Sequence, residues 1–249
     1  MVVVEVRRQA GCSCLFRDAA KAILRSSKNS GQQQRFSPPK KFCIPPMLPM
    51  RSREALHECI RDDFRIAHNM LQSEKADAHL LALDTMGKIT TRSGSSDMAA
   101  KLVLNNNDCT KQLLALIDLY TKDRPSPENE SRFRSTQCRK ILQVLANACE
   151  AISSSDLATI LSATDNGLKE RSFVSFLVSS LNEASKRPHE AFQAARCLRC
   201  LLVSKEVEGL LVEMSAIDAV SSANSVGISC HQELEQESFK LMGHLQNVC

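Results

Sequence analysis

The sequence predicts an all-α protein, and three observations lead to this prediction. Aromatic residues make up only 4% of the 249 residues, with one Tyr and no Trp, whereas β-strands favour aromatic and β-branched side chains. Glycine is equally scarce, at eight residues, and long stretches contain neither Gly nor Pro, as helices require. Apolar residues recur at intervals of three and four. The hydrophobic content of 43% and the charged content of 24% are those of an ordinary globular protein.

Residues 1–50 differ in composition from the rest of the chain and predict a basic, largely disordered tail. They hold nine Lys and Arg residues against two acidic ones, a formal charge of +7 that leaves −3 for residues 51–249. A run of three glutamines at 32–34 precedes prolines 38, 39, 45, 46 and 49, a composition that sustains no long helix and buries little surface. The helical domain is therefore expected over residues 51–249.

The tail and the cysteines bear on localisation. Residues 16–27 have the pattern of one short amphipathic helix with Arg17 and Lys21 on its polar side. Such a start is typical of a mitochondrial or plastid transit peptide, which is the organellar alternative, although Glu5 argues against it. Eleven cysteines, an odd number, lie mostly in helical patterns, and no secretory signal peptide is expected before them. Reduced thiols and an intracellular protein, cytoplasmic or nuclear, are expected, and no apolar stretch approaches the roughly 20 residues that cross a bilayer.

From Ser52 onward, amphipathic helix patterns follow one another. In the first, Leu56, Ile60, Ala67 and Leu71 recur at helical spacing. Similar patterns predict helices at about 75–91, 97–104, 109–121, 131–151, 156–163, 168–184, 189–203, 205–214 and 232–247. Short polar breaks separate them, and their Asn and Ser residues, as at 105–107 and 153–155, suit helix N-caps. The one longer break, residues 122–130, predicts an exposed loop.

A weak internal repeat runs through these helices. Four helical groups each carry a small residue, then a Leu or Met four positions later, then a Leu or Ile three positions further on. The triplets are Ala82, Met86 and Ile89; Cys138, Leu142 and Leu145; Ala194, Leu198 and Leu201; and Ser238, Met242 and Leu245. At this spacing the three side chains share one helix face, and the small residue permits close approach of a neighbouring helix. Intervals of 56, 56 and 44 residues indicate stacked repeats.

These patterns resemble the armadillo repeat, a three-helix unit. Leu145-Ala146-Asn147 is similar to the Leu-x-Asn pattern that ends the third helix of that unit. The stretch 211–217, LVEMSAI, is similar to the Leu-Val-Glu-x-Gly-Ala-Ile type of stretch that opens the next unit, with Ser215 in place of the usual glycine. The resemblance covers about residues 52–249 and implies a right-handed α-solenoid of about four degenerate repeats. Because two intervals exceed the usual unit of about 40–47 residues, HEAT-like helix pairing is the alternative.

The resemblance also implies a binding surface. In this family an asparagine near the end of the third helix holds the backbone of an extended peptide. The resemblance therefore implies that Asn147 and Asn247 hold the backbone of a peptide ligand, and that Gln143 and Arg199 are further groove residues. Two other units lack the asparagine, and the chain has no Trp, which the importin-type groove uses one turn earlier. A ligand other than a nuclear-localisation peptide is therefore expected.

No motif for catalysis or metal binding accompanies these helices. Six histidines are scattered singly, and the Cys197-x-x-Cys200 pair lacks a second pair at zinc spacing. No nucleotide-binding glycine motif is present. We therefore expect a protein that is not an enzyme, with no cofactor, no metal and no small-molecule substrate. A cysteine-dependent enzyme is one alternative, and it would need a thiol of lowered pKa beside a histidine.

Taken together, these features predict a protein-binding scaffold. A peptide or protein partner is expected on the concave surface formed by the last helix of each repeat, because solenoids present extended surfaces of this kind. The alternative is a nucleic acid or another acidic partner bound by residues 1–50. The charge of +7 favours that alternative, while the charge of −3 over the rest of the chain and the scarcity of aromatic side chains for base stacking oppose it.

Overall fold

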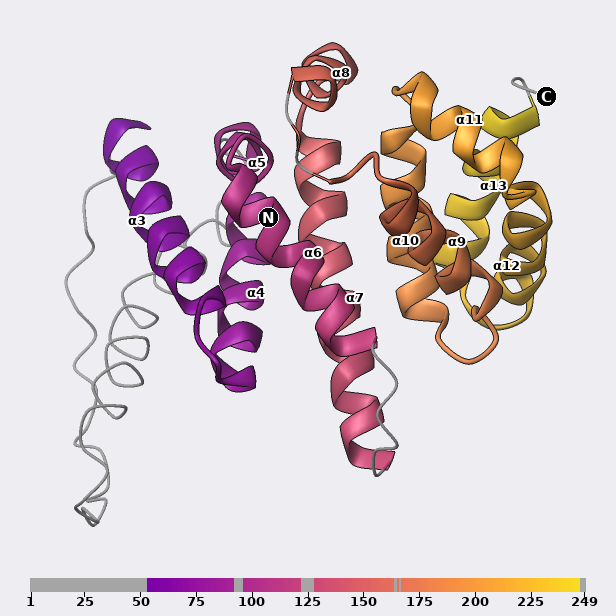
Figure 1. Cartoon of the computed structure of the whole chain (residues 1–249), viewed down its shortest axis with the longest axis horizontal. Coiled ribbons are helices and arrows are strands. Elements are labelled where there is room, and N and C mark those ends of the chain that lie inside the picture. The colour runs from indigo at the N-terminus through magenta and orange to yellow at the C-terminus, as the bar shows by residue number, and fades with distance from the viewer. Residues whose placement is uncertain (1–52, 92–95, 122–127, 164, 166, 247–249) are drawn as a thin grey trace, which may run out of the picture. The chain divides into compact units, whose positions relative to one another are not determined.

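The computed structural model describes residues 53–91, 96–121, 128–163, 165 and 167–246, and every regular element in this part of the chain is an α-helix (Figure 1). The prediction of an all-α chain is confirmed there. Residues His57–Cys249 form one compact unit. The expected tail over residues 1–50, its short helix at 16–27 and Asn247 lie outside the described residues.

The helices follow the order α3 (Arg53–Leu71), α4 (Ala76–Thr90), α5 (Ser96–Leu104), α6 (Asn107–Thr121), α7 (Glu128–Ala151), α8 (Ser154–Ala163), α9 (Arg171–Asn182), α10 (Pro188–Leu201), α11 (Lys205–Glu213), α12 (Ala216–Cys230) and α13 (Gln232–Gln246). Two polar breaks cap the next helix as expected. The Asn106 side chain accepts a hydrogen bond from the Cys109 N–H at 3.1 Å, and Ser153 Oγ accepts one from the Asp156 N–H at 3.2 Å. Helix α7 already begins at Glu128, inside the range where a loop was expected.

Helix α12 is the one described helix that the sequence pattern does not predict. Its residues include four serines, one Asn and one Gly, which are weak helix formers. Packing compensates for this, because α12 lies against α9, α10, α11 and α13 and buries Ala219, Val220 and Ala223. At its end, a Cβ on Gly227 would collide with the backbone of Glu235. Glycine therefore lets the end of α12 approach the start of α13 closely.

The repeated triplets lie on the helices that form the centre of the packing. Helix α4 packs against α7, α7 against α10, and α10 against α13. Met86, Leu142 and Leu198, the middle members of the first three triplets, are each fully buried. In the fourth triplet Met242 is only half-buried, and its neighbour Leu241 occupies the core instead. The first and last members of this triplet, Ser238 and Leu245, are buried as the pattern predicts.

Four other helices flank this row. Helices α5 and α6 pack against α7, α9 packs against α10, and α12 packs against α9, α10 and α13. Polar side chains form hydrogen bonds between several of these helices. His79 of α4 is hydrogen-bonded to the Tyr120 hydroxyl of α6 at 2.7 Å, and Gln137 of α7 donates to the Ala76 carbonyl at 3.2 Å. The core of His57–Cys249 therefore includes specific polar contacts as well as aliphatic packing.

Candidate partner-binding groove

A groove of about 730 Å³ lies over the C-terminal part of α7 and is lined by residues of α7, α8, α10 and α13. Its charged lining consists of Glu150 from α7, Arg196 and Arg199 from α10, and Glu237 and Lys240 from α13. Apolar side chains complete it, among them Leu157, Phe192 and Val203. Three helices that pack in succession thus contribute to one concave, mixed-charge surface.

Ion pairs link the three helices across this groove. Glu150 is the central carboxylate: its two oxygens accept hydrogen bonds from the guanidinium of Arg196, and Arg199 Nη2 lies 2.6 Å from its Oε1. Arg199 also donates through Nε to Glu237. Lys240 Nζ lies 3.3 Å from the second oxygen of Glu237. The three basic groups therefore share two carboxylates, so the network carries a net positive charge.

Both arginines in the network are held in the charged form. Burial by itself would lower the pKa of the Arg196 guanidinium, but its hydrogen bond and Coulomb attraction to Glu150 outweigh burial and raise the pKa. For Arg199 burial again opposes the charge, and the hydrogen bond to Glu237 is the largest of the contributions that raise the pKa. These arginines are fixed, permanently charged donors.

Asn147 lies beside this network on α7 and is buried, with 6% of its surface exposed. Its Oδ1 accepts a hydrogen bond from Arg196 Nη2 at 2.9 Å. Its Nδ2 has no hydrogen-bond partner within the described part of the chain. The guanidinium of Arg196 also stands 5.5 Å from the centre of the Phe192 ring. Arg196 thus connects Asn147 to the groove, while the Nδ2 of Asn147 remains available as a hydrogen-bond donor.

The other residues expected in the groove have different positions. Arg199 lines the groove. Gln143 is exposed on α7 and is not part of the groove lining, and Asn247 lies beyond the last described residue. Sequence reasoning missed Glu150, Arg196, Glu237 and Lys240. The one local signal for them was the spacing of three residues between Glu237 and Lys240, which places the two side chains on one helix face.

Three thiols lie close to the groove, and all three are buried among apolar side chains. Cys149 and Cys200 contribute to its lining, and Cys197 donates to the Leu142 carbonyl at 3.4 Å. Burial raises the pKa of the Cys200 thiol to about 11, and it also raises the pKa values of Cys149 and Cys197. Thiols in this state are weak nucleophiles and poor metal ligands, because the thiolate is the reactive form.

The described residues form neither a metal-binding cluster nor a membrane span. No group of three or more His, Cys, Asp or Glu side chains in this part of the chain is arranged to hold a metal ion. No described helix is long and apolar enough to span a membrane.

Comparison with known proteins adds little to this description. No protein-family model matches the chain, and no curated protein matches it. Among solved structures, the chain is similar to the crystal structure of an engineered protein from the Northeast Structural Genomics Consortium. The match has a TM-score of 0.33 and 14% sequence identity, and it covers 79% of this chain and 92% of that chain. A likeness at this level carries no argument about fold or function.

Proposed function

We propose that this protein is a non-catalytic scaffold that binds an extended peptide segment of a protein partner in the groove over α7, α10 and α13. The observation that carries the proposal is the groove itself, in which three successively packed helices present charged groups held in ion pairs next to apolar side chains. Peptide ligands need both features: polar groups to hold the backbone and its charges, and apolar contacts for alternate side chains.

The arrangement of helix lengths supports an armadillo-like solenoid as the framework of this scaffold. A helix of 9 or 10 residues followed by two longer helices occurs three times, as α5–α6–α7, α8–α9–α10 and α11–α12–α13. The last helix of each group packs against the last helix of the next group. Helices α3 and α4 precede these groups as a two-helix unit. In this proposal the three groups and this pair are the four degenerate repeats.

The charges of the groove favour an acidic peptide. Arg196, Arg199 and Lys240 outnumber Glu150 and Glu237, and a ligand carboxylate can replace Glu150 as the partner of either arginine. Because both arginines are already desolvated and oriented, such an exchange requires little further ordering. Movement of Arg196 toward such a ligand would also uncover Asn147, whose Nδ2 has no hydrogen-bond partner in the described part of the chain and can donate to a peptide carbonyl.

A non-catalytic role is proposed because the thiols beside the groove have raised pKa values. The cysteine-dependent alternative needs a thiol of lowered pKa, and burial raises the pKa of each thiol beside the groove. The nucleic-acid alternative depends on residues 1–50, which lie outside the described residues, so no contact in the described structure favours it.

The proposal can be tested by selecting peptides from a phage-displayed random library on the full-length protein. The dissociation constants of the selected peptides would be measured by fluorescence anisotropy. Val203→Glu introduces a negative charge into the groove lining, and Lys240→Ala removes one of its cations. Each is expected to weaken binding about tenfold, which corresponds to about 1.4 kcal/mol. Val212→Glu is the matched control, because Val212 is 50% exposed on α11 and lies outside the groove.

Circular dichroism would first establish that the three variants keep their helicity. Weakening by both groove variants, together with unchanged binding by the control, is the expected result. Peptides that bind Val203→Glu and Lys240→Ala as tightly as they bind the natural protein would contradict the proposal, and so would a library that yields no specific peptide.

A further inference from the structure

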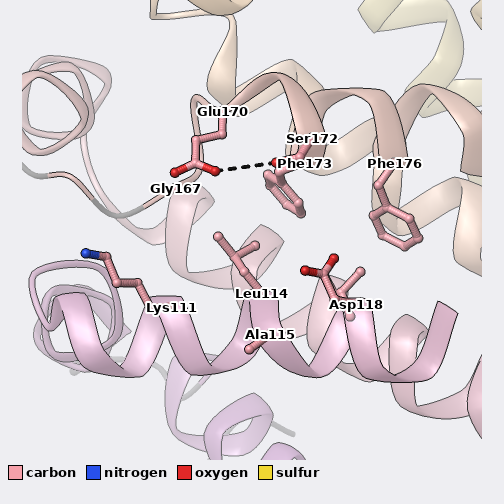
Figure 2. Close-up of a pocket in the computed structure, with 10 residues that line it drawn as sticks. Lys111, Leu114, Ala115, Asp118, Gly167, Glu170, Ser172, Phe173 and Phe176 are labelled. Atoms are coloured by element: carbon pink, nitrogen blue, oxygen red, sulfur yellow. Dashed lines mark hydrogen bonds between the residues drawn. The ribbon is translucent and has the colours of Figure 1, made fainter. Parts of the chain in front are cut away.

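A second, smaller pocket lies between α6 and α9 and shares no lining residue with the groove (Figure 2). Its volume is about 270 Å³. Leu114 and Ala115 of α6 lie on one side, and the rings of Phe173 and Phe176 of α9 lie on the other (Figure 2). Phe173 is buried and Phe176 is half-buried, so the second ring offers part of its surface to an occupant.

One end of the pocket is built around Gly167, which precedes α9. This residue has a φ of +78°, in the left-handed region. A Cβ at this position would lie 2.7 Å from Cδ1 of Leu114, a distance that forces a side chain to move. The backbone conformation therefore favours glycine, and a larger residue would also displace the Leu114 side chain.

The rim of the pocket is acidic. Asp118 projects from α6 toward the side of the pocket that carries the two phenylalanines, and Glu170 stands near Gly167 (Figure 2). Glu170 accepts a hydrogen bond from the Ser172 hydroxyl at 3.4 Å. The one lysine of the rim, Lys111, pairs with Asp165 at 3.6 Å. Within the described part of the chain, neither Asp118 nor Glu170 forms an ion pair with a basic side chain.

We propose that this pocket binds the arginine side chain of a partner protein. A volume of about 270 Å³ is below the roughly 300–1,000 Å³ of sites that enclose a whole small molecule, so one long side chain is the occupant of suitable size. A cation is favoured because two carboxylates at the rim have no cationic partner among the described side chains and because aromatic faces attract cations.

Arginine satisfies this pocket better than lysine or an uncharged side chain does. Its planar guanidinium stacks on an aromatic face and donates two parallel hydrogen bonds to a carboxylate. Phe176 and Asp118 offer these two partners on opposite sides of the pocket. An apolar side chain would fill the same space but would remove water from Asp118 without replacing its hydrogen bonds, which is unfavourable.

The test uses the full chain and three acetylated, amidated pentapeptides of alanine with a central arginine, citrulline or lysine. Citrulline has the shape of arginine without its charge. Binding would be followed by 1H–15N correlation spectra of the protein at millimolar peptide concentrations. The arginine peptide is expected to shift the signals of Ala115, Phe173 and Phe176 in a saturable manner. The citrulline peptide is expected to bind at least about tenfold more weakly, and the lysine peptide to bind with intermediate affinity.

Two matched variants assign the effect to the pocket. Asp118→Asn removes the rim carboxylate and is expected to raise the dissociation constant of the arginine peptide about tenfold. Asp108→Asn removes the same charge from an exposed position on the same helix, about 15 Å away along its axis, and is expected to have no effect. Equal binding of arginine and citrulline peptides, or binding that Asp118→Asn leaves unchanged, would overturn the proposal, as would the absence of saturable shifts.

Sedimentation velocity distinguishes a separate partner from a second copy of this chain. The proposal of a separate partner expects no self-association that depends on Asp118. A dimer that Asp118→Asn dissociates would show that another copy fills the pocket, and it would overturn the proposal. This pocket and the groove over α7, α10 and α13 have separate variants, so either proposal can fail without the other.

Discussion

Arg196 on α10 and Asn147 on α7 are joined by a hydrogen bond of 2.9 Å between Nη2 and Oδ1, although the two residues are 49 positions apart in the chain. The same guanidinium is bound to Glu150, one turn further along α7. Arg196 therefore connects two neighbouring helices at the point where their surfaces form the groove.

Replacement of Arg196 by alanine is expected to destabilise the protein. The side chain is 15% exposed, and its loss leaves Asn147 Oδ1 and part of Glu150 without donors. We expect the free energy of unfolding in urea to fall by about 1–2 kcal/mol. Arg65→Ala is the control, because Arg65 is 74% exposed in a pair with Asp62, and it should change stability by less than about 0.5 kcal/mol. Equal losses of unfolding free energy for Arg196→Ala and Arg65→Ala would show that the Arg196 network stabilises the protein no more than an exposed ion pair does.

Replacement of Ser215 by glycine is expected to stabilise the protein. Ser215 precedes α12 with φ 51° and ψ 41°, and it is the one non-glycine residue with positive φ in the described chain. This left-handed conformation costs most residues about 1–2 kcal/mol, whereas glycine adopts it readily. The free energy of unfolding should therefore rise by about 1 kcal/mol.

The control for this substitution is Ser222→Gly, which places the same residue change in the exposed interior of α12. Glycine is a poor helix former, so this variant should lose about 0.5 kcal/mol. If the free energy of unfolding in urea rises for Ser215→Gly and falls for Ser222→Gly, the strain can be assigned to Ser215. A loss of stability in both would contradict it.

The stability contributed by Glu190 is expected to depend on pH. Its carboxylate is 4% exposed and accepts hydrogen bonds from Ser135 and Ser180. Burial raises its pKa above the ordinary value of 4.5, with Arg187 and the two hydroxyls acting in the opposite direction. The folded state therefore holds its proton more tightly than the unfolded state does. The resulting penalty on folding is present above the raised pKa and disappears as the pH falls below 4.5.

Glu190→Gln tests this dependence, because it keeps an acceptor oxygen and removes the titration. The variant should be more stable than the natural protein at pH 7, and the difference should narrow as the pH falls toward 4, as measured by urea unfolding across that range. The exposed Glu233→Gln serves as the control, with no expected narrowing. A difference for Glu190→Gln that is constant with pH would contradict the role of burial.

The cysteines are expected to differ sharply in reactivity in the folded protein. Cys230 is exposed, whereas Cys149, Cys197 and Cys200 are buried with raised pKa values. Labelling with iodoacetamide at pH 8, followed by peptide mass spectrometry, should modify Cys230 rapidly and the other three only after unfolding, because alkylation requires the thiolate and access to it. Rapid labelling of any one of the three buried thiols would favour the cysteine-dependent enzyme instead.

Local patterns in the sequence correctly predict ten of the eleven described helices. Spacings of three and four residues and the caps at Asn106 and Ser153 are properties of neighbouring residues, so the sequence alone determines them. The same patterns identified Leu142 and Leu198 as core residues. They failed for α12, where serines and a glycine form a helix because Ala219, Val220 and Ala223 pack against other helices.

The site depended on the tertiary structure to a greater degree. The resemblance to the armadillo repeat suggested Gln143 and Asn147 as groove residues. Packing instead leaves Gln143 exposed outside the groove and places Asn147 beneath Arg196. The chain by itself determined an all-α protein with regularly spaced core residues. Only the tertiary structure decided which charges meet, because Glu237 contacts Arg199 across 38 residues of chain. Helix periodicity constrains the face on which a residue lies but not the partner that this face meets.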